Sequence, residues 1–330
     1  MRPQPARGRD RGPSASTTWT LALDLGTQNI RAATRDAGLV LDARREHALP
    51  LPEVGETGDG RWASTPVEVI DGLLRDIVRI TDPPSHWRVL AASSMVTPPG
   101  ERAQIERLLR RLGAEDVAWI PAVLAAAVGG QLPVLDAHAS LVVLAGHRAT
   151  EVAVMSRGGF VDLRTRAIGG AHLDAALSHW LRRDHKLIVE PARVEELRIR
   201  GAHTREAGGP TAWVTGYEVF SGLPRDVEVD PMHVATGIAS LWEDVRNLVL
   251  DVLRDASPEA CADLVETGIL LTGGLAQTEG LAASLAEATG LPCVVADSAS
   301  QAVIEGTRSL IDVDLPEAIT ASWALEPEPP

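Results

Sequence analysis

An internal repeat constrains the fold of this chain more than any other feature. The segment LALDLGTQNIRAATRDAGLVLD, at residues 21–42, aligns without a gap with LVVLAGHRATEVAVMSRGGFVD, at residues 141–162, so that Gly26 falls on Gly146. Each copy predicts a strand, a tight glycine turn, a second strand, another turn and a third strand. Two copies of one unit predict two similar domains.

Helical and strand-like patterns alternate in the rest of the chain. VEVIDGLLRDIVRI and RAQIERLLRRLGAEDV are amphipathic at helical spacing, whereas WRVLAASSMV and ASLVVLAG are typical of buried strands. This alternation predicts an α/β architecture. With 330 residues, 45% of them hydrophobic, the chain is long enough to form two domains with substantial cores.

The composition argues against several classes of function. A formal net charge of −14 disfavours a nucleic-acid-binding surface. No apolar run approaches the ~18 residues that span a bilayer, and the N-terminus lacks the apolar core of a signal peptide. We therefore expect a soluble, cytoplasmic protein. Cys261 and Cys293 lack the spacing of a zinc site and are expected to be buried thiols.

The two ends of the chain have the composition of unfolded segments. Residues 1–18 combine Arg, Pro, Gly and Ser without periodicity, which predicts a disordered basic arm. A contact of this arm with anionic lipid or a partner is the alternative to a plain tail. Residues 314–330 are expected to form a flexible acidic tail.

The glycine turn after the first strand suggests a phosphate site. Without a Cβ, Gly26 lets backbone N–H groups approach a phosphate closely. Asp24, at the end of the strand, would hold a hydrated Mg²⁺ against that phosphate. Two such hairpins facing each other would bind a nucleotide from both sides. The alternative is that Asp24 and Gly26 only maintain the turn.

Several motifs together resemble one known family. They are LDLGTQN, SLVVLAGHRATEVAVMSRGGFVDLRTRAIGGAHLDAAL, GILLTGGLAQTEGL and TGLPCVVADSASQAV. Over about residues 20–312 the chain resembles the actin-like ATPases and, within them, the MreB family. The resemblance implies the actin-like, duplicated ribonuclease H-like fold, with two similar domains around a nucleotide cleft. It also implies ATP with Mg as ligand, and a cytoskeletal or scaffold role in cell shape or cell-wall synthesis.

The resemblance also implies domain boundaries and partners. Domain I would cover residues 19–136, with a small subdomain shortened to about 39–66, and would be completed by a C-terminal helix at about 302–313. Domain II would cover residues 137–301, with a small insert at about 190–238. The implied partners are further copies of this chain, other actin-like proteins and cell-wall synthesis proteins. Because the shortened subdomain helps to form the protofilament in the family, its truncation puts ordinary polymerisation in doubt.

The family's nucleotide-binding residues can be assigned to positions of this sequence. The resemblance implies Asp24, Gly26, Thr27 and Asn29 in the first phosphate motif, with Asp24 as the metal ligand. It implies Gly146 in the second turn, Gly273 and Gly274 in the adenosine motif, and Glu195 and Arg198 as a helical pair that contacts the adenosine. A solvated charge pair on a helix is the alternative for Glu195 and Arg198.

Three departures from the family pattern predict impaired hydrolysis. Leu144 stands where the family has an aspartate, and Ala122 stands where it has the glutamate that positions the attacking water. His147 and Arg148 add side chains where the family has glycine. Loss of one water-orienting group typically costs on the order of 10² to 10⁴ in rate, so no catalytic residue is assigned.

Two other functions are alternatives to this one. An active, polymerising ATPase remains open if Arg148 contacts phosphate directly. A sugar kinase of the same superfamily is disfavoured, because the sequence shows neither a sugar-site insertion nor a catalytic aspartate after the second turn.

Aromatic residues and histidines admit further interpretations. Packing is the default role for the eight Trp residues, but Trp213, Tyr217 and Phe220 would together form an exposed apolar patch for a membrane or a partner. His172, beside Asp174 on a predicted helix, is expected to be structural rather than a metal ligand.

Overall fold

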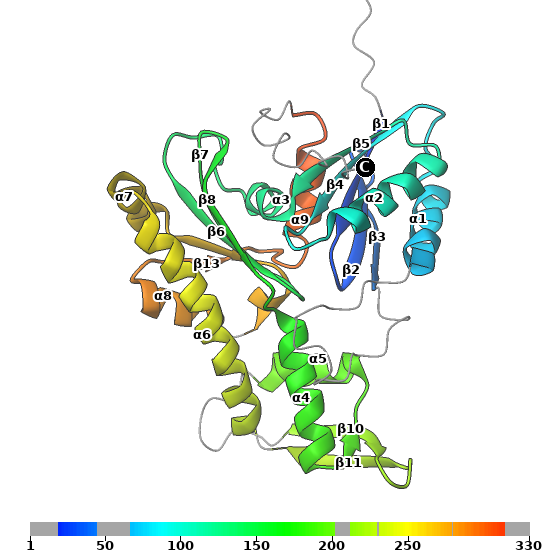
Figure 1. Ribbon diagram of the computed structural model, residues 1–330, viewed down its shortest axis with the longest axis vertical. Coiled ribbons are helices and arrows are strands. Elements are labelled where there is room, and N and C mark those ends of the chain that lie inside the picture. Colours follow the sequence, from blue (N-terminus) through cyan, green and yellow to red (C-terminus); the bar gives the residue numbers. More distant parts are fainter. Residues whose placement is uncertain (1–18, 45–66, 202–211, 230, 279, 314–330) are drawn as a thin grey trace, which may run out of the picture.

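The computed structural model describes residues 19–44, 67–201, 212–229, 231–278 and 280–313. Figure 1 shows two sheets with helices between and around them, and a smaller lobe at one end. The predicted arm at residues 1–18, the tail at residues 314–330 and most of the shortened subdomain lie outside the described residues.

The first sheet has five strands in the order β3-β2-β1-β4-β5. They are β1 (Trp19–Leu25), β2 (Asn29–Thr34), β3 (Gly38–Arg44), β4 (Trp87–Ser93) and β5 (Asp116–Pro121). β1, β2 and β3 pair antiparallel, and β4 and β5 continue the sheet in parallel with β1. Buried side chains of α1 (Val67–Thr81) and α2 (Pro99–Arg111) pack into the core of this sheet.

The second sheet repeats this arrangement. Its order is β13-β12-β6-β7-β8, with β6 (Ser140–Ala145), β7 (Thr150–Ser156), β8 (Gly159–Arg166), β12 (Ile269–Thr272) and β13 (Cys293–Val295). The antiparallel hairpins β6–β7–β8 correspond to β1–β2–β3, while β12 and β13 run parallel to β6 as β4 and β5 do to β1. Residues of α6 (Pro231–Asp255), α7 (Pro258–Thr267) and α8 (Leu281–Thr289) contribute to its core. The predicted α/β fold with a duplicated unit is confirmed.

A smaller lobe is attached to the second sheet through two helices. It comprises part of α4 (Gly170–Asp184), α5 (Pro191–Gly201) and a three-stranded sheet of β9 (Leu187–Ile188), β10 (Ala212–Glu218) and β11 (Pro224–Val229). Figure 1 shows this sheet at the end of the molecule farthest from β7, with the long helix α6 running toward it. The boundaries of the lobe as a domain insert stay a prediction.

Two short helices lie where the two halves of the molecule meet, each half being one five-stranded sheet with the helices packed on it. α3 (Ala122–Gly129) and α9 (Ala302–Ser309) lie together between the two sheets (Figure 1). A Cβ on Gly129 would lie 1.9 Å from the carbonyl oxygen of Ala302, and a Cβ on Gly306 would lie 1.8 Å from that of Ala125. The two backbones therefore touch, which only glycine permits at these positions.

Two sequence-based details are wrong. The helix predicted over RAQIERLLRRLGAEDV ends at Arg111, and Asp116 already begins β5, because Gly113 takes a positive φ of 106° that ends the helical path. Cys261 and Cys293 are half-buried rather than buried. Burial still raises the pKa of the Cys293 thiol to about 11. Among the described residues, no helix combines the length and apolar character that crossing a membrane requires.

Candidate nucleotide cleft

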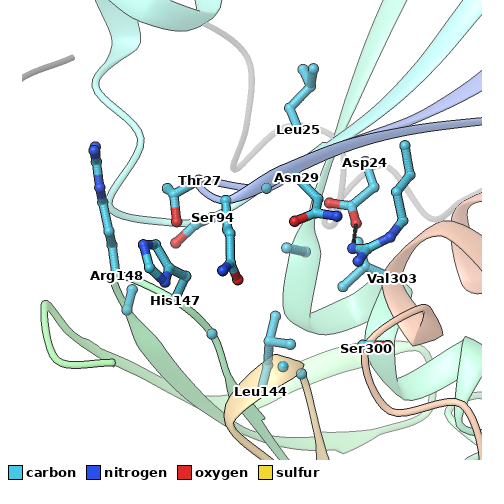
Figure 2. A pocket seen from close by; sticks show the side chains of 18 of the residues that line it. Asp24, Leu25, Thr27, Asn29, Ser94, Leu144, His147, Arg148, Ser300 and Val303 are labelled. Atoms are coloured by element: carbon cyan, nitrogen blue, oxygen red, sulfur yellow. Dashed lines mark hydrogen bonds and ion pairs between the residues drawn. The ribbon is translucent and has the colours of Figure 1, made fainter. Parts of the chain in front are cut away.

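The ends of β1 and β6 face each other across a cavity of about 260 Å³. Figure 2 shows Asp24, Thr27 and Asn29 on one side of this cleft and Leu144 on the other. All the predicted binding residues except Arg198 line it: Asp24, Gly26, Thr27, Asn29, Gly146, Glu195, Gly273 and Gly274. The structure thus brings into one cavity residues that are far apart in the sequence, while their role toward a ligand stays a prediction.

The two glycine turns are built alike. A Cβ on Gly26 would lie 2.8 Å from the carbonyl oxygen of Asn29, and a Cβ on Gly146 would lie 2.8 Å from that of Ala149. Both contacts are too short for any side chain, so each hairpin requires glycine for its own geometry. The amide of Gly146 also donates a hydrogen bond of 2.8 Å to Ala149. The turn-maintaining role is therefore sufficient to explain these glycines without a ligand.

The second turn is fixed by the helix that follows it. The amides of Gly170 and Ala171, at the start of α4, donate hydrogen bonds to the carbonyl oxygens of Gly146 and His147, at 3.1 and 2.7 Å. These donors would otherwise be unsatisfied at a helix N-terminus. Within α4, the ring nitrogen Nδ1 of His172 accepts a hydrogen bond from the Gly169 amide at 3.1 Å, which is a structural role.

Gly274 differs from the other cleft glycines. Gly273 has φ 95°, and a Cβ there would lie 2.3 Å from the carbonyl oxygen of Ala145, so it is required by the protein. A Cβ on Gly274 would meet nothing within 4 Å. Gly274 lines the cavity, so the absence of a side chain there leaves cavity space that a larger residue could occupy without a clash.

Asp24 is paired with a cation of the same hairpin. The β1–β2 register places Asp24 opposite Arg31, and Nη1 of Arg31 lies 3.3 Å from Oδ2 of Asp24. Figure 2 marks this ion pair with a dashed line. Nε of Arg31 lies 3.0 Å from Oδ2 of Asp42, so the guanidinium bridges two carboxylates. The side chains of Arg31 and Asp24 are only 13% and 7% exposed.

The second hairpin also carries a carboxylate, but on its second strand, β7, whereas Asp24 lies on the first strand of its hairpin, β1. Leu144 is paired with Glu151 in the register of β6 and β7, as Asp24 is with Arg31. Oε1 of Glu151 accepts hydrogen bonds from the Ser94 hydroxyl and, at 2.9 Å, from the Met95 amide, both after β4 of the first sheet. Burial raises the pKa of this carboxyl. Glu151 thus links the two halves of the molecule across the cleft.

Glu195 and Arg198 form an ion pair at 3.6 Å, but the pair is largely buried rather than solvated. Arg198 is only 3% exposed, lies 2.7 Å from Asp174 of α4 and donates a 3.2 Å hydrogen bond to the hydroxyl of Thr278. Glu195 lines the cavity and accepts hydrogen bonds from Gln28, at 3.1 Å, and from Arg44. The alternative of a solvated helical pair is therefore wrong. Through these bonds Glu195 bridges the lobe to the first hairpin unit, which consists of β1, β2, β3 and the turns between them.

His147 and Arg148 project from the second turn into the cleft. Both line the cavity, and Figure 2 shows them beside Thr27. Burial, followed by the positive charges of Arg148 and Arg198, lowers the pKa of His147 to about 4, so its imidazole is neutral at pH 7. Nδ1 of His147 is buried and makes no hydrogen bond with the described residues.

Sequence reasoning missed Arg31, Gln28, Ser94 and Glu151 as cleft residues. A signal was present for two of them, because the gapless repeat puts Glu151 on Arg31. In each copy this position faces the strand-end residue across an antiparallel hairpin. Ser94 and Gln28 carried no comparable signal, since their partners lie far away in the sequence.

Known structures share this architecture. MreB5 of Spiroplasma citri, in a crystal structure bound to AMPPNP, aligns with a TM-score of 0.76 at 22% identity, over 89% of this chain and 96% of that chain. A MamK double helical filament aligns with a TM-score of 0.70 at 16% identity, over 91% of this chain and 100% of that chain. The fold is therefore that of the actin-like proteins.

Sequence comparison gives the same family. The chain is 28% identical to the cell shape-determining protein MreB of Escherichia coli (strain K12), covering 89% of this chain and 93% of the relative. It is 24% identical to the cell shape-determining protein Mbl of Bacillus subtilis (strain 168), covering 88% and 95%. The family described as MreB/Mbl protein matches residues 65–315. That match takes in β4 and β5 of the first sheet, all five strands of the second sheet and the helices between them. Because it covers well over half of the sequence, the chain belongs to the MreB/Mbl family.

Proposed function

We propose that this protein is an MreB-type cytoskeletal or scaffold protein, linked to cell shape or cell-wall synthesis, that binds a nucleotide in its cleft and hydrolyses it poorly. The observation that carries the proposal is the composition of the cleft walls. Gly26 and Gly146 give the two hairpin turns the same geometry, but only the first turn keeps the family's residues, and Leu144 and Ala122 line the cavity where the family has its aspartate and glutamate.

Three features support nucleotide binding. The cavity lies between two similar glycine turns, the buried Nδ1 of His147 has no hydrogen-bond partner among the described residues, and the open space at Gly274 is not needed for packing. Buried polar atoms are usually paired, so the His147 nitrogen is suited to a ligand donor. Structures of the related MreB5 are described as bound to AMPPNP and to ADP.

The acidic residues of the cleft support impaired hydrolysis. Asp24 pairs with Arg31, Glu151 accepts hydrogen bonds from Ser94 and Met95, and Glu195 accepts them from Gln28 and Arg44. Each of these carboxylates thus has at least one oxygen engaged with protein groups. A general base must reach the water it activates, and Ala122, only 6% exposed, has no group to do so.

The second candidate is an active ATPase that polymerises on ATP. The observation in its favour is that Arg148 lines the cavity, where a guanidinium can bind phosphate oxygens directly. Burial lowers the pKa of Arg148, but an arginine remains protonated at neutral pH.

Phosphate release separates the two candidates. Purified protein is mixed with ATP and Mg²⁺, and phosphate release and pelleting are followed beside those of Escherichia coli MreB. The scaffold proposal predicts release at least about 100-fold slower than that of the relative, the scale expected for one missing water-orienting group. Release at the relative's rate that is abolished in Asp24→Ala would overturn it.

We further propose that this protein associates with copies of itself in the cytoplasm and contacts a membrane peripherally. Trp213, Tyr217 and Phe220 are 67%, 51% and 82% exposed on and beside β10, whose opposite face buries Val214. Such a surface is suited to a partner or a membrane. Replacing Trp213 and Phe220 with Ser is expected to reduce pelleting or liposome binding without lowering the melting temperature. Unchanged behaviour in both assays would exclude this surface.

A further inference from the structure

The residues around Asp24 do not fit the magnesium ion that the family resemblance implies. Magnesium is usually held by one or two carboxylates together with several waters. The Arg31 guanidinium already lies 3.3 Å from the Asp24 carboxylate, on the side where the hairpin register places it. A divalent cation at this carboxylate would lie beside a fixed positive charge.

Arg31 is held in this position by a second carboxylate. Its Nε lies 3.0 Å from Asp42, and Asp42 also accepts a 2.6 Å hydrogen bond from the Asn29 amide group. Arg31 is therefore anchored within the β1–β2–β3 unit and presents its Nη1 end toward Asp24 and the cavity that both residues line.

The opposite wall presents no accessible carboxylate to a metal. Leu144 has no oxygen, and Glu151 is only 1% exposed: its Oε1 accepts hydrogen bonds from Ser94 and Met95, and its Oε2 is buried. Within the parts of the chain that the structure describes, no three His, Cys, Asp or Glu side chains gather as a candidate metal site. Positive charge is instead supplied by side chains, because Arg31 and Arg148 line the cavity from its two walls.

We infer that Arg31 takes the place of the divalent cation, so that this cleft binds the phosphates of a nucleoside polyphosphate without a metal ion. The inference rests on the proposed nucleotide binding. Guanidinium groups bind phosphate oxygens in charge-assisted, often bidentate hydrogen bonds. Arg31 would neutralise Asp24 and the phosphates together, which is the task of a hydrated metal ion in a carboxylate site.

Titration of a fluorescent ATP analogue in EDTA and in Mg²⁺ tests the inference. Affinities in the two solutions that agree within a factor of about two, a difference below 0.5 kcal/mol, are expected. Binding that needs Mg²⁺ would overturn the inference and leave the proposed function standing. Absence of binding in both solutions would overturn the proposed function and the inference with it.

Two variants test whether Asp24 binds a metal ion or Arg31 replaces it, and Asp24→Asn has opposite expected effects under the two roles. If Asp24 were a metal ligand, Asp24→Asn would weaken binding in Mg²⁺. Under the inference, Asp24→Asn tightens binding in EDTA, because it removes a negative charge near the phosphates and leaves Arg31 anchored by Asp42. Arg31→Leu is expected to weaken binding in EDTA about tenfold or more, as loss of a charged hydrogen bond does.

Arg164 provides the matched control. It lies on β8, two residues after the second copy of the repeat, and pairs with Asp162 at 3.0 Å and with Asp255 at 2.5 Å without lining the cavity. Arg164→Leu should leave both affinities unchanged. Circular dichroism melting checks that each variant is folded, and Arg31→Lys, which keeps the charge, should bind in EDTA more tightly than Arg31→Leu. Equal EDTA affinities of the folded Arg31→Leu protein and the wild type would overturn the inference.

Discussion

At the scale of single residues, burial perturbs the carboxyl group of Glu151 in the cleft. It is 1% exposed, and burial raises its pKa, so the folded state disfavours its charged form. A carboxyl whose pKa is higher in the folded than in the unfolded state lowers stability once the pH exceeds the unfolded value. The two hydrogen bonds from Ser94 and Met95 offset part of this effect.

Glu151→Gln is therefore expected to stabilise the protein near neutral pH. The amide oxygen can accept the same two hydrogen bonds without a buried charge, so the free energy of unfolding at neutral pH should be higher than that of the wild type. The gain should shrink as the pH falls toward about 4.3, where the unfolded carboxyl also becomes protonated. Thermal melts between pH 4.5 and 8 measure it.

Glu266 serves as the control for this substitution. It lies on the exposed surface of α7, so Glu266→Gln should leave the melting temperature nearly unchanged across the same range. A stability difference between wild type and Glu151→Gln that stays constant with pH would contradict the assigned role of burial.

Gly274 gives a second prediction at the residue scale. Because a Cβ there meets no protein atom within 4 Å, Gly274→Leu should fold normally and fill part of the cavity. Nucleotide affinity is expected to fall about tenfold or more, since a side chain would occupy space intended for the ligand. Gly100→Leu, which also adds a side chain in open space but lies outside the cavity, is the control. Unaltered affinity in Gly274→Leu would place the ligand elsewhere.

At the scale of elements, α3 and α9 pack so closely where the two halves meet that no side chain fits at Gly129 or Gly306. Gly306→Ala would bring a methyl group against the carbonyl oxygen of Ala125, which lies 1.8 Å from the ideal Cβ position. Because the obstacle is backbone, the helices must separate, and the free energy of unfolding should fall by about 3 kcal/mol or more, the upper range for overpacking. Urea unfolding monitored by circular dichroism measures the change.

Gly72→Ala is the matched control for this prediction. Gly72 lies in α1 and a Cβ there meets nothing within 4 Å. Alanine should raise the stability by up to about 1 kcal/mol, because it is the better helix former. Equal effects of the two glycine substitutions would show that helix propensity, rather than contact between α3 and α9, decides the outcome.

The elements were predictable where their signals are local. The repeat gave β1–β3 and β6–β8 because glycine turns and alternation lie within each segment. The helical pattern over residues 102–117 predicts a helix that is too long, because the periodicity does not reveal the positive φ at Gly113. In the cleft, strand-end residues were found by motif, whereas Arg31 and Glu151 required knowledge of the cross-strand pairing. The contact of Glu195 with Gln28 depends on tertiary structure alone.

At the scale of the whole molecule, side-chain bridges hold the cleft narrow. Its cavity of about 260 Å³ is slightly below the range of roughly 300–1,000 Å³ that is usual for ligand pockets. Glu195 on α5 binds Gln28 and Arg44 of the first hairpin unit, and Glu151 on β7 binds Ser94 and Met95. These bonds join the two walls of the cleft.

Glu195→Ala is therefore expected to let the cleft open. The substitution removes both bonds to the first hairpin unit, whereas Arg198 keeps its partner Asp174, so the lobe itself should stay intact. The free energy of unfolding should fall by only about 1 kcal/mol, while the radius of gyration measured by small-angle X-ray scattering increases. Glu196→Ala, on the same helix and 3.7 Å from Arg193, should leave the scattering unchanged. An unaltered radius in Glu195→Ala would mean that the bonds of Glu195 to Gln28 and Arg44 do not hold the cleft closed, and that the Glu151 bonds or the α3–α9 contact suffice.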